Sequence, residues 1–237
     1  STNIKGLSMS FWLGAVVSDY LLELNGNTKD KRYVWVKEQS REFLLYPLKV
    51  VAFIITLSGL FAMVIEVRHF TGHSFEVYIV RLSATLVSFI TLLLLHTKVG
   101  KKRPFVLVHI LLLAIIISSA IMIYIIPTTL VINSQILGLM IFTSALFLSW
   151  EVRNQIIIAI YYNIVFAAAI LLSDQSIYFL PNMYESVLFV LFLSGISVIG
   201  AAVNFKLKMD VAEKSIKVEE SEKKYKAIFN NSAEGIY

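Results

Sequence analysis

Two of the four histidines are placed where they could hold a prosthetic group, and the chain has no cysteine that could do so instead. His96 and His109 flank a short lysine-rich stretch, and each lies at the edge of a long apolar run. If those runs are antiparallel helices, both imidazoles lie at similar depth, as do the axial ligands of a b-type haem in a helix bundle. The alternative is two boundary histidines that hydrogen-bond to the backbone, with His96 near a helix C-terminus. Haem b is therefore one candidate cofactor.

The other two histidines form a candidate metal site together with a carboxylate. Glu66, His69 and His73 are spaced by three and then four residues. On one continuous helix they would share a face and could ligate a divalent metal ion. Gly72 lies among them and favours a helix end, in which case these side chains form a solvated polar rim. Both interpretations stay open on the sequence alone.

Polar side chains inside apolar runs form a third group. Arg81 lies within such a run, and an arginine there normally has a partner, for which Glu66 and Glu76 are the candidates. Other polar side chains could line a pocket for an apolar small molecule, or could be hydrogen-bonding contacts between helices, which is their commoner role. The predicted pocket residues are Tyr124, Tyr161, Tyr162 and Asn163, with Ser118-Ser119 and Asn204 also at membrane depth.

No catalytic residues are predicted. The sequence contains no phosphate-binding glycine loop, no Ser-His-Asp set spaced as in known hydrolases and no zinc-protease helix. We expect these 237 residues to have no enzymatic turnover of their own.

The elements that must position these side chains are membrane spans. Hydrophobic residues make up 57% of the chain and charged residues 16%, which excludes a disordered chain and an ordinary soluble enzyme. Apolar runs near 20 residues match the thickness of a hydrocarbon core, and the absence of period-two alternation argues for helices rather than an outer-membrane barrel. The sequence predicts an all-α polytopic membrane protein with six spans at residues 44–67, 77–96, 105–126, 130–150, 156–173 and 187–205.

Lysine and arginine predict the orientation of these spans. Basic residues precede the first span, fill the connection between the second and third, and follow the sixth, whereas the opposite connections have almost none. By the positive-inside rule, we expect both termini in the cytoplasm. The net charge of +5 is then a sign of a lipid bilayer partner and not of nucleic-acid binding.

The predicted bundle, residues 44–205, is preceded by residues 1–43. Apolar residues recur at intervals of three and four between Met9 and Leu24, which predicts an amphipathic helix lying on the membrane surface. Asn25-Gly26-Asn27 is typical of a turn. A basic connector would lead from there to the first span.

The composition changes to lysine and glutamate in residues 206–228. Apolar residues fall at a and d positions of one heptad frame, with Lys214 and Ser221 at the intervening d positions; the apolar set is Leu207, Val211, Val218, Tyr225 and Ile228. This pattern predicts a two-stranded parallel coiled coil, and therefore a homodimer. The alternative is a single solvated helix leaving the membrane.

The last residues, Ser221 to Tyr237, resemble the beginning of a PAS domain. The resemblance rests on a charged helix followed by Tyr225, Ile228-Phe229, Asn231-Ser232 and Glu234-Gly235-Ile236. It implies that a cap helix ends near Asn230-Asn231-Ser232 and that the domain's first strand begins within residues 229–237. It also implies that the chain continues into a cytoplasmic sensory domain and an output domain.

A membrane bundle, a coiled coil and a PAS domain together resemble bacterial signalling receptors, mostly sensor histidine kinases and next diguanylate cyclases. The predicted connections on the outer side are too short for a folded domain, so the stimulus must act within the membrane or at its rim. The sequence therefore predicts a sensor of an apolar ligand or of a membrane-embedded cofactor. The rival interpretation is a small transporter or channel. It is disfavoured because the prolines lie only at span edges, and broken spans are typical of transporters.

Overall fold

The computed structural model describes residues 31–148 and 150–234, and this part of the chain is helical with no strand. The predicted amphipathic helix and the Asn25-Gly26-Asn27 turn lie outside these residues. The chain divides into two compact units, one formed by residues 40–201 and the other by residues 1–39 with 202–237. Helices α2 and α8 each contribute to both units, and the candidate site belongs to the first.

Six helices in the described residues are long and apolar enough to cross a membrane, which confirms the predicted six spans. They are α2 Lys31–His69, α3 Ser74–Leu94, α5 Pro104–Ile125, α6 Leu130–Phe147, α7 Val152–Leu172 and α8 Met183–Glu234. Four short elements complete the order: η1 Thr71–His73, α4 Lys98–Lys102, η2 Pro127–Thr129 and η3 Gln175–Phe179.

Most helix ends differ from the predicted spans by a few residues, but α2 begins at Lys31, within the predicted basic connector, and α8 continues to Glu234. α7 begins at Val152 and α8 at Met183, each four residues before the expected start, because polar residues form the first helical turn. α6 ends at Phe147 and not at residue 150, since Leu148 is extended. α3 ends at Leu94, so His96 lies in the turn after the helix.

Proline sets two of the boundaries. Pro104 occupies the first turn of α5, where its missing N–H leaves no helical hydrogen bond unmade. Pro127 follows α5 and begins η2.

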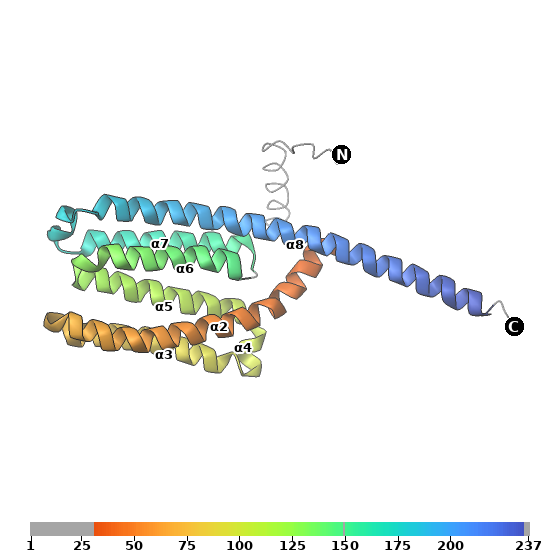
Figure 1. The fold of residues 1–237 in the computed structure, drawn as a ribbon, viewed down its shortest axis with the longest axis horizontal. Coiled ribbons are helices and arrows are strands. Elements are labelled where there is room, and N and C mark those ends of the chain that lie inside the picture. Colours follow the sequence, from red (N-terminus) through yellow and green to blue (C-terminus); the bar gives the residue numbers. More distant parts are fainter. Residues whose placement is uncertain (1–30, 149, 235–237) are drawn as a thin grey trace, which may run out of the picture. The chain divides into compact units, whose positions relative to one another are not determined.

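The 40–201 unit is a bundle in which α5 is central (Figure 1). α5 packs against α3, α6 and α7. Most of its buried apolar residues belong to a core that also takes buried residues from α2, α6, α7 and the start of α8, whereas Met122 packs with Val77 and Val80 of α3 in a second cluster. Apolar residues outside that core, such as Phe53, Phe61 and Phe192, are exposed, as expected of side chains that face lipid.

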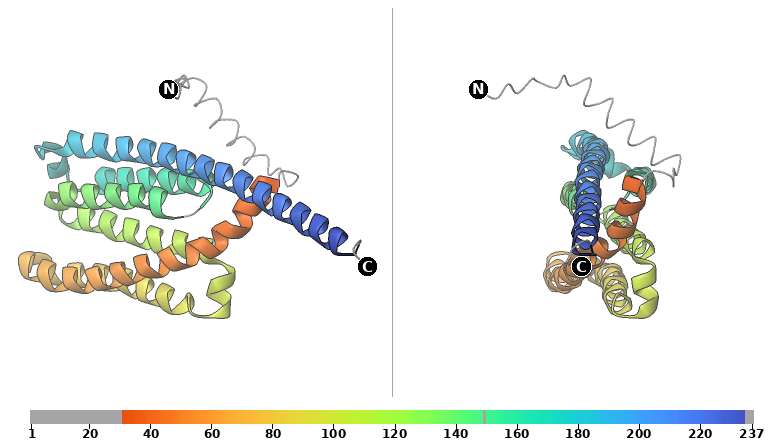
Figure 2. Two further views of the ribbon diagram at one scale, coloured as in Figure 1. Left: turned by 45° about the vertical axis from the view of Figure 1, so that its right-hand side comes forward. Right: turned by 90° about the vertical axis from the view of Figure 1, so that its right-hand side faces the viewer.

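The connections of the bundle lie at two opposite ends (Figures 1 and 2). One end, which we call the distal end, carries the connections 70–73, 126–129 and 173–182. The other, the proximal end, carries the connections 95–103 and 148–151.

In the second unit, one face of α8 is buried and another is exposed. Phe205, Met209 and Ala212 are buried, as are Tyr33 and Val36 of α2. Arg32 forms an ion pair with Glu213, with 3.7 Å between Nη1 and Oε2. The five apolar residues of the heptad frame, Leu207, Val211, Val218, Tyr225 and Ile228, are all exposed in the single chain.

α8 also corrects one expectation. The helix break predicted at Asn230-Asn231-Ser232 is wrong, because α8 continues to Glu234. A strand needs a neighbouring strand to satisfy its backbone, and the described residues contain none, so the helix propagates instead. Residues 235–237 lie outside the described part of the chain.

Candidate functional site

The site begins with polar contacts that join α2 to α3. The Ala52 carbonyl accepts hydrogen bonds from Ser88 Oγ and from Thr56 Oγ1, each at 2.8 Å. Thr56 Oγ1 and Ser88 Oγ are themselves 3.1 Å apart. Such bonds between helices contribute about 0.6 kcal/mol each on average in membrane proteins. These hydrogen bonds align α2 with α3 in the part of both spans that lies towards the proximal end.

A close approach of the two helices follows about two turns further along α2. A Cβ on Gly59 would overlap Thr85 Oγ1 and would lie 3.2 Å from Thr85 Cβ. The Thr85 hydroxyl donates to the Arg81 carbonyl at 2.7 Å, so its position is set within α3. Glycine is required at 59 because no larger residue leaves room for this threonine.

An ion pair links the same helices nearer the distal end. Arg81 Nε lies 2.6 Å from Glu66 Oε2, and Arg81 Nη2 lies 2.8 Å from Glu66 Oε1, which is a bidentate pair. The two side chains are 14% and 24% exposed. The predicted partner of Arg81 is therefore confirmed as Glu66, whereas Glu76 is exposed in the first turn of α3.

A cavity of about 300 Å³ lies against this pair, between α2, α3, α5 and α6. This volume is at the lower end of the range for small-molecule sites. Its lining residues are Ile55, Ser58, Gly59, Ala62, Glu66, Arg81, Ala84, Thr85, Ile115, Ser118, Ile136 and Met140. Ile136 is half exposed within the apolar span of α6, so the cavity opens towards lipid.

The ion pair lies towards the distal end of the cavity, and the deeper lining is mostly apolar, with Ser58 and Thr85 as its polar members. Arg81 lies seven residues after the start of α3, and Ser118 lies seven residues before the end of α5. At 1.5 Å per residue, both are about 10 Å from the distal end. Ile115 and Met140, ten residues from the distal ends of their helices, lie about 15 Å in. A bound molecule would therefore have its polar group near Arg81 and Ser118.

Ser118 has an unsatisfied hydroxyl. It is 4% exposed, and its Oγ has no hydrogen-bond partner. A buried polar group without a partner costs about 1–3 kcal/mol, so this hydroxyl is available to a molecule that enters the cavity. Arg81 likewise has an open edge, because its two hydrogen bonds within the described residues use Nε and Nη2 and leave Nη1.

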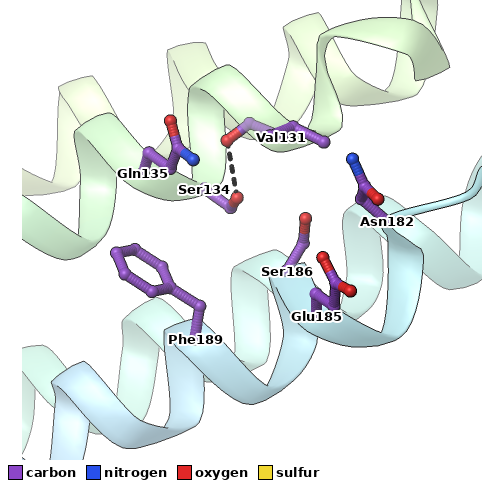
Figure 3. A pocket seen from close by; sticks show the side chains of 7 residues that line it. All are labelled: Val131, Ser134, Gln135, Asn182, Glu185, Ser186 and Phe189. Atoms are coloured by element: carbon purple, nitrogen blue, oxygen red, sulfur yellow. Dashed lines mark hydrogen bonds between the residues drawn. The ribbon is translucent and has the colours of Figure 1, made fainter.

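A second, smaller cavity of about 220 Å³ lies at the distal end between α6 and α8 (Figure 3). Ser134 and Gln135 of α6 face Glu185 and Ser186 of α8 across it, with Asn182 at its edge and Phe189 below. The Ser134 hydroxyl donates to the Val131 carbonyl at 2.8 Å. This lining is mostly polar and its side chains come from the helix ends, as expected of a hydrated rim.

The predicted metal site is not assembled. Both oxygens of Glu66 are used by Arg81, and the imidazole of His69 packs edge-on against Phe70 with ring centroids 4.8 Å apart. α2 ends at His69 and His73 belongs to η1, so the three side chains do not share one helical face. No cluster of three or more metal-ligating side chains occurs in residues 31–148 and 150–234.

The predicted haem ligands have unequal surroundings. His96 is exposed, and its Nδ1 lies 2.9 Å from the Leu92 carbonyl, an arrangement that leaves Nε2 open. His109 Nε2 instead lies 3.2 Å from Asn154 Oδ1 on α7, and its ring stacks on Trp150. Neither histidine lines the two cavities. To ligate a haem, His109 would have to give up its hydrogen bond to Asn154 or coordinate through Nδ1.

The four predicted pocket residues are not brought together around either cavity. Tyr124 is exposed, whereas Tyr162 is fully buried in the core beside Phe166. The hydroxyls of Tyr161 and Tyr162 are buried without a partner. Asn163 Nδ2 donates to Ser194 Oγ at 2.9 Å, so this residue joins α7 to α8. Of the serine, tyrosine and asparagine residues named from the sequence, Ser118 is the one that lines the larger cavity.

One polar network was not predicted. Gln155 is fully buried, donates to the Ile141 carbonyl at 3.2 Å and accepts hydrogen bonds from Ser144 Oγ and Trp150 Nε1. It was missed because the fifth span was expected to begin at residue 156, whereas α7 begins one turn earlier. A glutamine next to a long apolar run was the available signal.

Comparison of the chain with protein-family models, curated proteins and solved structures finds no match.

Proposed function

We propose that this chain is the membrane sensor module of a bacterial signalling receptor, most simply a sensor histidine kinase. The observation that carries the proposal is α8, a single helix from Met183 to Glu234 that begins as a membrane span and ends as a charged extension. A displacement of the span within the bundle would be passed along such a helix without a flexible joint. The stimulus would act in the larger cavity, since the distal connections are short.

The proposed output lies beyond Tyr237. It rests on the resemblance of residues 221–237 to the start of a PAS domain, with a histidine kinase as the first candidate and a diguanylate cyclase as the second. Both termini of this chain would be cytoplasmic in a bacterial inner membrane, because the basic connections are at the proximal end. The reading frame beyond Tyr237 tests this directly. A PAS domain followed by a kinase core is expected, and a frame without any output domain would refute it.

The proposed receptor is a parallel homodimer. Its support is the heptad frame of α8, whose apolar residues are all exposed in the single chain and would be covered by a second copy.

Cysteine cross-linking in native membranes tests the dimer. The chain has no cysteine, so Val211→Cys and Val218→Cys each introduce the only thiol. Both a positions should form disulfide-linked dimers on mild oxidation. Glu220→Cys, at a c position of the same exposed helix, is the matched control and should cross-link several-fold less. Equal cross-linking at all three sites would indicate random collision and would refute the coiled coil.

The rival transporter interpretation has its own measurement. Solute flux in proteoliposomes of this chain, saturable and above that of empty vesicles, would support a transporter and count against the sensor.

A further inference from the structure

We propose that the cavity between α2, α3, α5 and α6 binds an uncharged amphiphile with a medium-length apolar chain and one oxygen-bearing head group. The inference rests on the sensor proposal in one respect, namely that this molecule would be the stimulus. The binding site itself stands on the geometry of the cavity.

The length of the ligand follows from the volume. A cavity of about 300 Å³ holds about ten non-hydrogen atoms, if each occupies the roughly 30 Å³ that a water molecule takes in the liquid. Ile55, Ile115 and Met140 form most of the wall at depth. The polar members there are Ser58 and Thr85, and the Thr85 hydroxyl already donates to the Arg81 carbonyl. A chain of eight or nine carbons with one oxygen fits both the volume and the walls.

The position of the head group follows from the unpaired polar atoms. Ser118 Oγ is buried without a partner, and Arg81 Nη1 is open on the edge away from Glu66. Both residues line the cavity and lie at the same depth, about 10 Å from the distal end. An oxygen placed there could accept from Arg81 and exchange a hydrogen bond with Ser118, so the chain would extend towards the middle of the membrane.

The charge of the head group follows from the ion pair. Glu66 already neutralises Arg81 through two hydrogen bonds. A carboxylate or an ammonium group would therefore add an uncompensated charge at membrane depth, which is strongly unfavourable. A hydroxyl or a carbonyl adds none. The half-exposed Ile136 on the rim gives such a molecule a path from the hydrocarbon layer.

The test uses the full 237-residue chain in lipid nanodiscs and a series of radiolabelled primary alcohols from 1-butanol to 1-tetradecanol. Retention above that of empty nanodiscs is measured together with the shift in the thermal unfolding midpoint. Partitioning into lipid rises steadily with chain length. Binding in a cavity of limited volume instead gives a maximum, which we expect at 1-octanol or 1-nonanol, with decanoate and decylammonium binding more weakly. A steady rise with no maximum would overturn the proposal.

Two substitutions localise the binding. Ala84→Phe fills the cavity and should abolish the maximum, whereas Ala167→Phe, the same change on an exposed part of α7, should leave it intact. Ser118→Ala should weaken 1-nonanol binding about two- to tenfold, as expected for the loss of one hydrogen bond. It should not lower the stability of the ligand-free protein, because no bond is broken there. A maximum that survives Ala84→Phe would place the alcohol elsewhere and refute the site.

The outcome is separate from that of the sensor proposal. Cross-linking at Val218→Cys is measured with and without 1-nonanol in the same nanodiscs. If 1-nonanol binds but cross-linking does not change, the binding site is supported and its role as the stimulus site is not. If the chain still cross-links as a dimer but alcohol binding shows no maximum with chain length, the dimer is supported and the ligand proposal is refuted.

Discussion

Removing both partners of the Glu66–Arg81 pair should destabilise the bundle no more than removing one of them. Glu66→Gln leaves the guanidinium without its counter-ion, and Arg81→Gln does the same to the carboxylate. Two unit charges about 4 Å apart attract by about 4 kcal/mol at an effective dielectric constant of 20. Breaking a buried pair from one side typically costs about 3–5 kcal/mol.

The expected values are smaller than that range because the two side chains keep 14% and 24% of their exposure. We expect each single variant to lower the free energy of unfolding by about 2–3 kcal/mol. The double variant Glu66→Gln/Arg81→Gln should lower it by about 2 kcal/mol, well short of the sum, because no unpaired charge is left behind. The resulting coupling energy is about 3 kcal/mol.

The assay is reversible unfolding of the purified chain by a denaturing detergent, followed by far-ultraviolet ellipticity. Glu76→Gln is the matched control, since Glu76 is an exposed glutamate on the same helix as Arg81. It should cost at most about 1 kcal/mol, through the lost favourable charge at a helix N-terminus. Additive single variants that each cost no more than Glu76→Gln would refute the reasoning, because the pair would then behave as a solvated one.

Three further predictions concern other contacts of the bundle. Gly59→Val should force Thr85 aside and separate α2 from α3, which should lower the free energy of unfolding by about 1–3 kcal/mol in the same assay. An unchanged free energy of unfolding would contradict the close approach of the two helices. Gln155→Leu should cost about 1–3 kcal/mol and shift the tryptophan emission maximum, because the indole N–H loses its acceptor; an unchanged spectrum would count against the network. The purified protein from haem-replete cells should show no Soret band; a band lost in His96→Ala and His109→Ala would restore the haem hypothesis.

The six spans could be predicted from the sequence because their signal is local. A run of about 20 apolar residues has to become a helix in lipid, whatever surrounds it, since the backbone has no other partner. The partner of Arg81 could be predicted for a similar reason. An arginine inside a span needs a counter-ion at its own depth, and Glu66 and Glu76 were the two acidic residues near enough in the sequence. The choice between them needed the structure.

Helix rotation is what the sequence left undetermined and the tertiary structure decided. In water, an apolar stripe shows which face of a helix is buried, but α5 is apolar on all sides because lipid and protein core accept the same side chains. Nothing in the order of residues therefore indicates that Ser118 lines a cavity, that Tyr162 lies in the core or that Tyr124 is exposed. Those positions depend on how four neighbouring helices pack, which is a property of contacts between residues far apart in the chain.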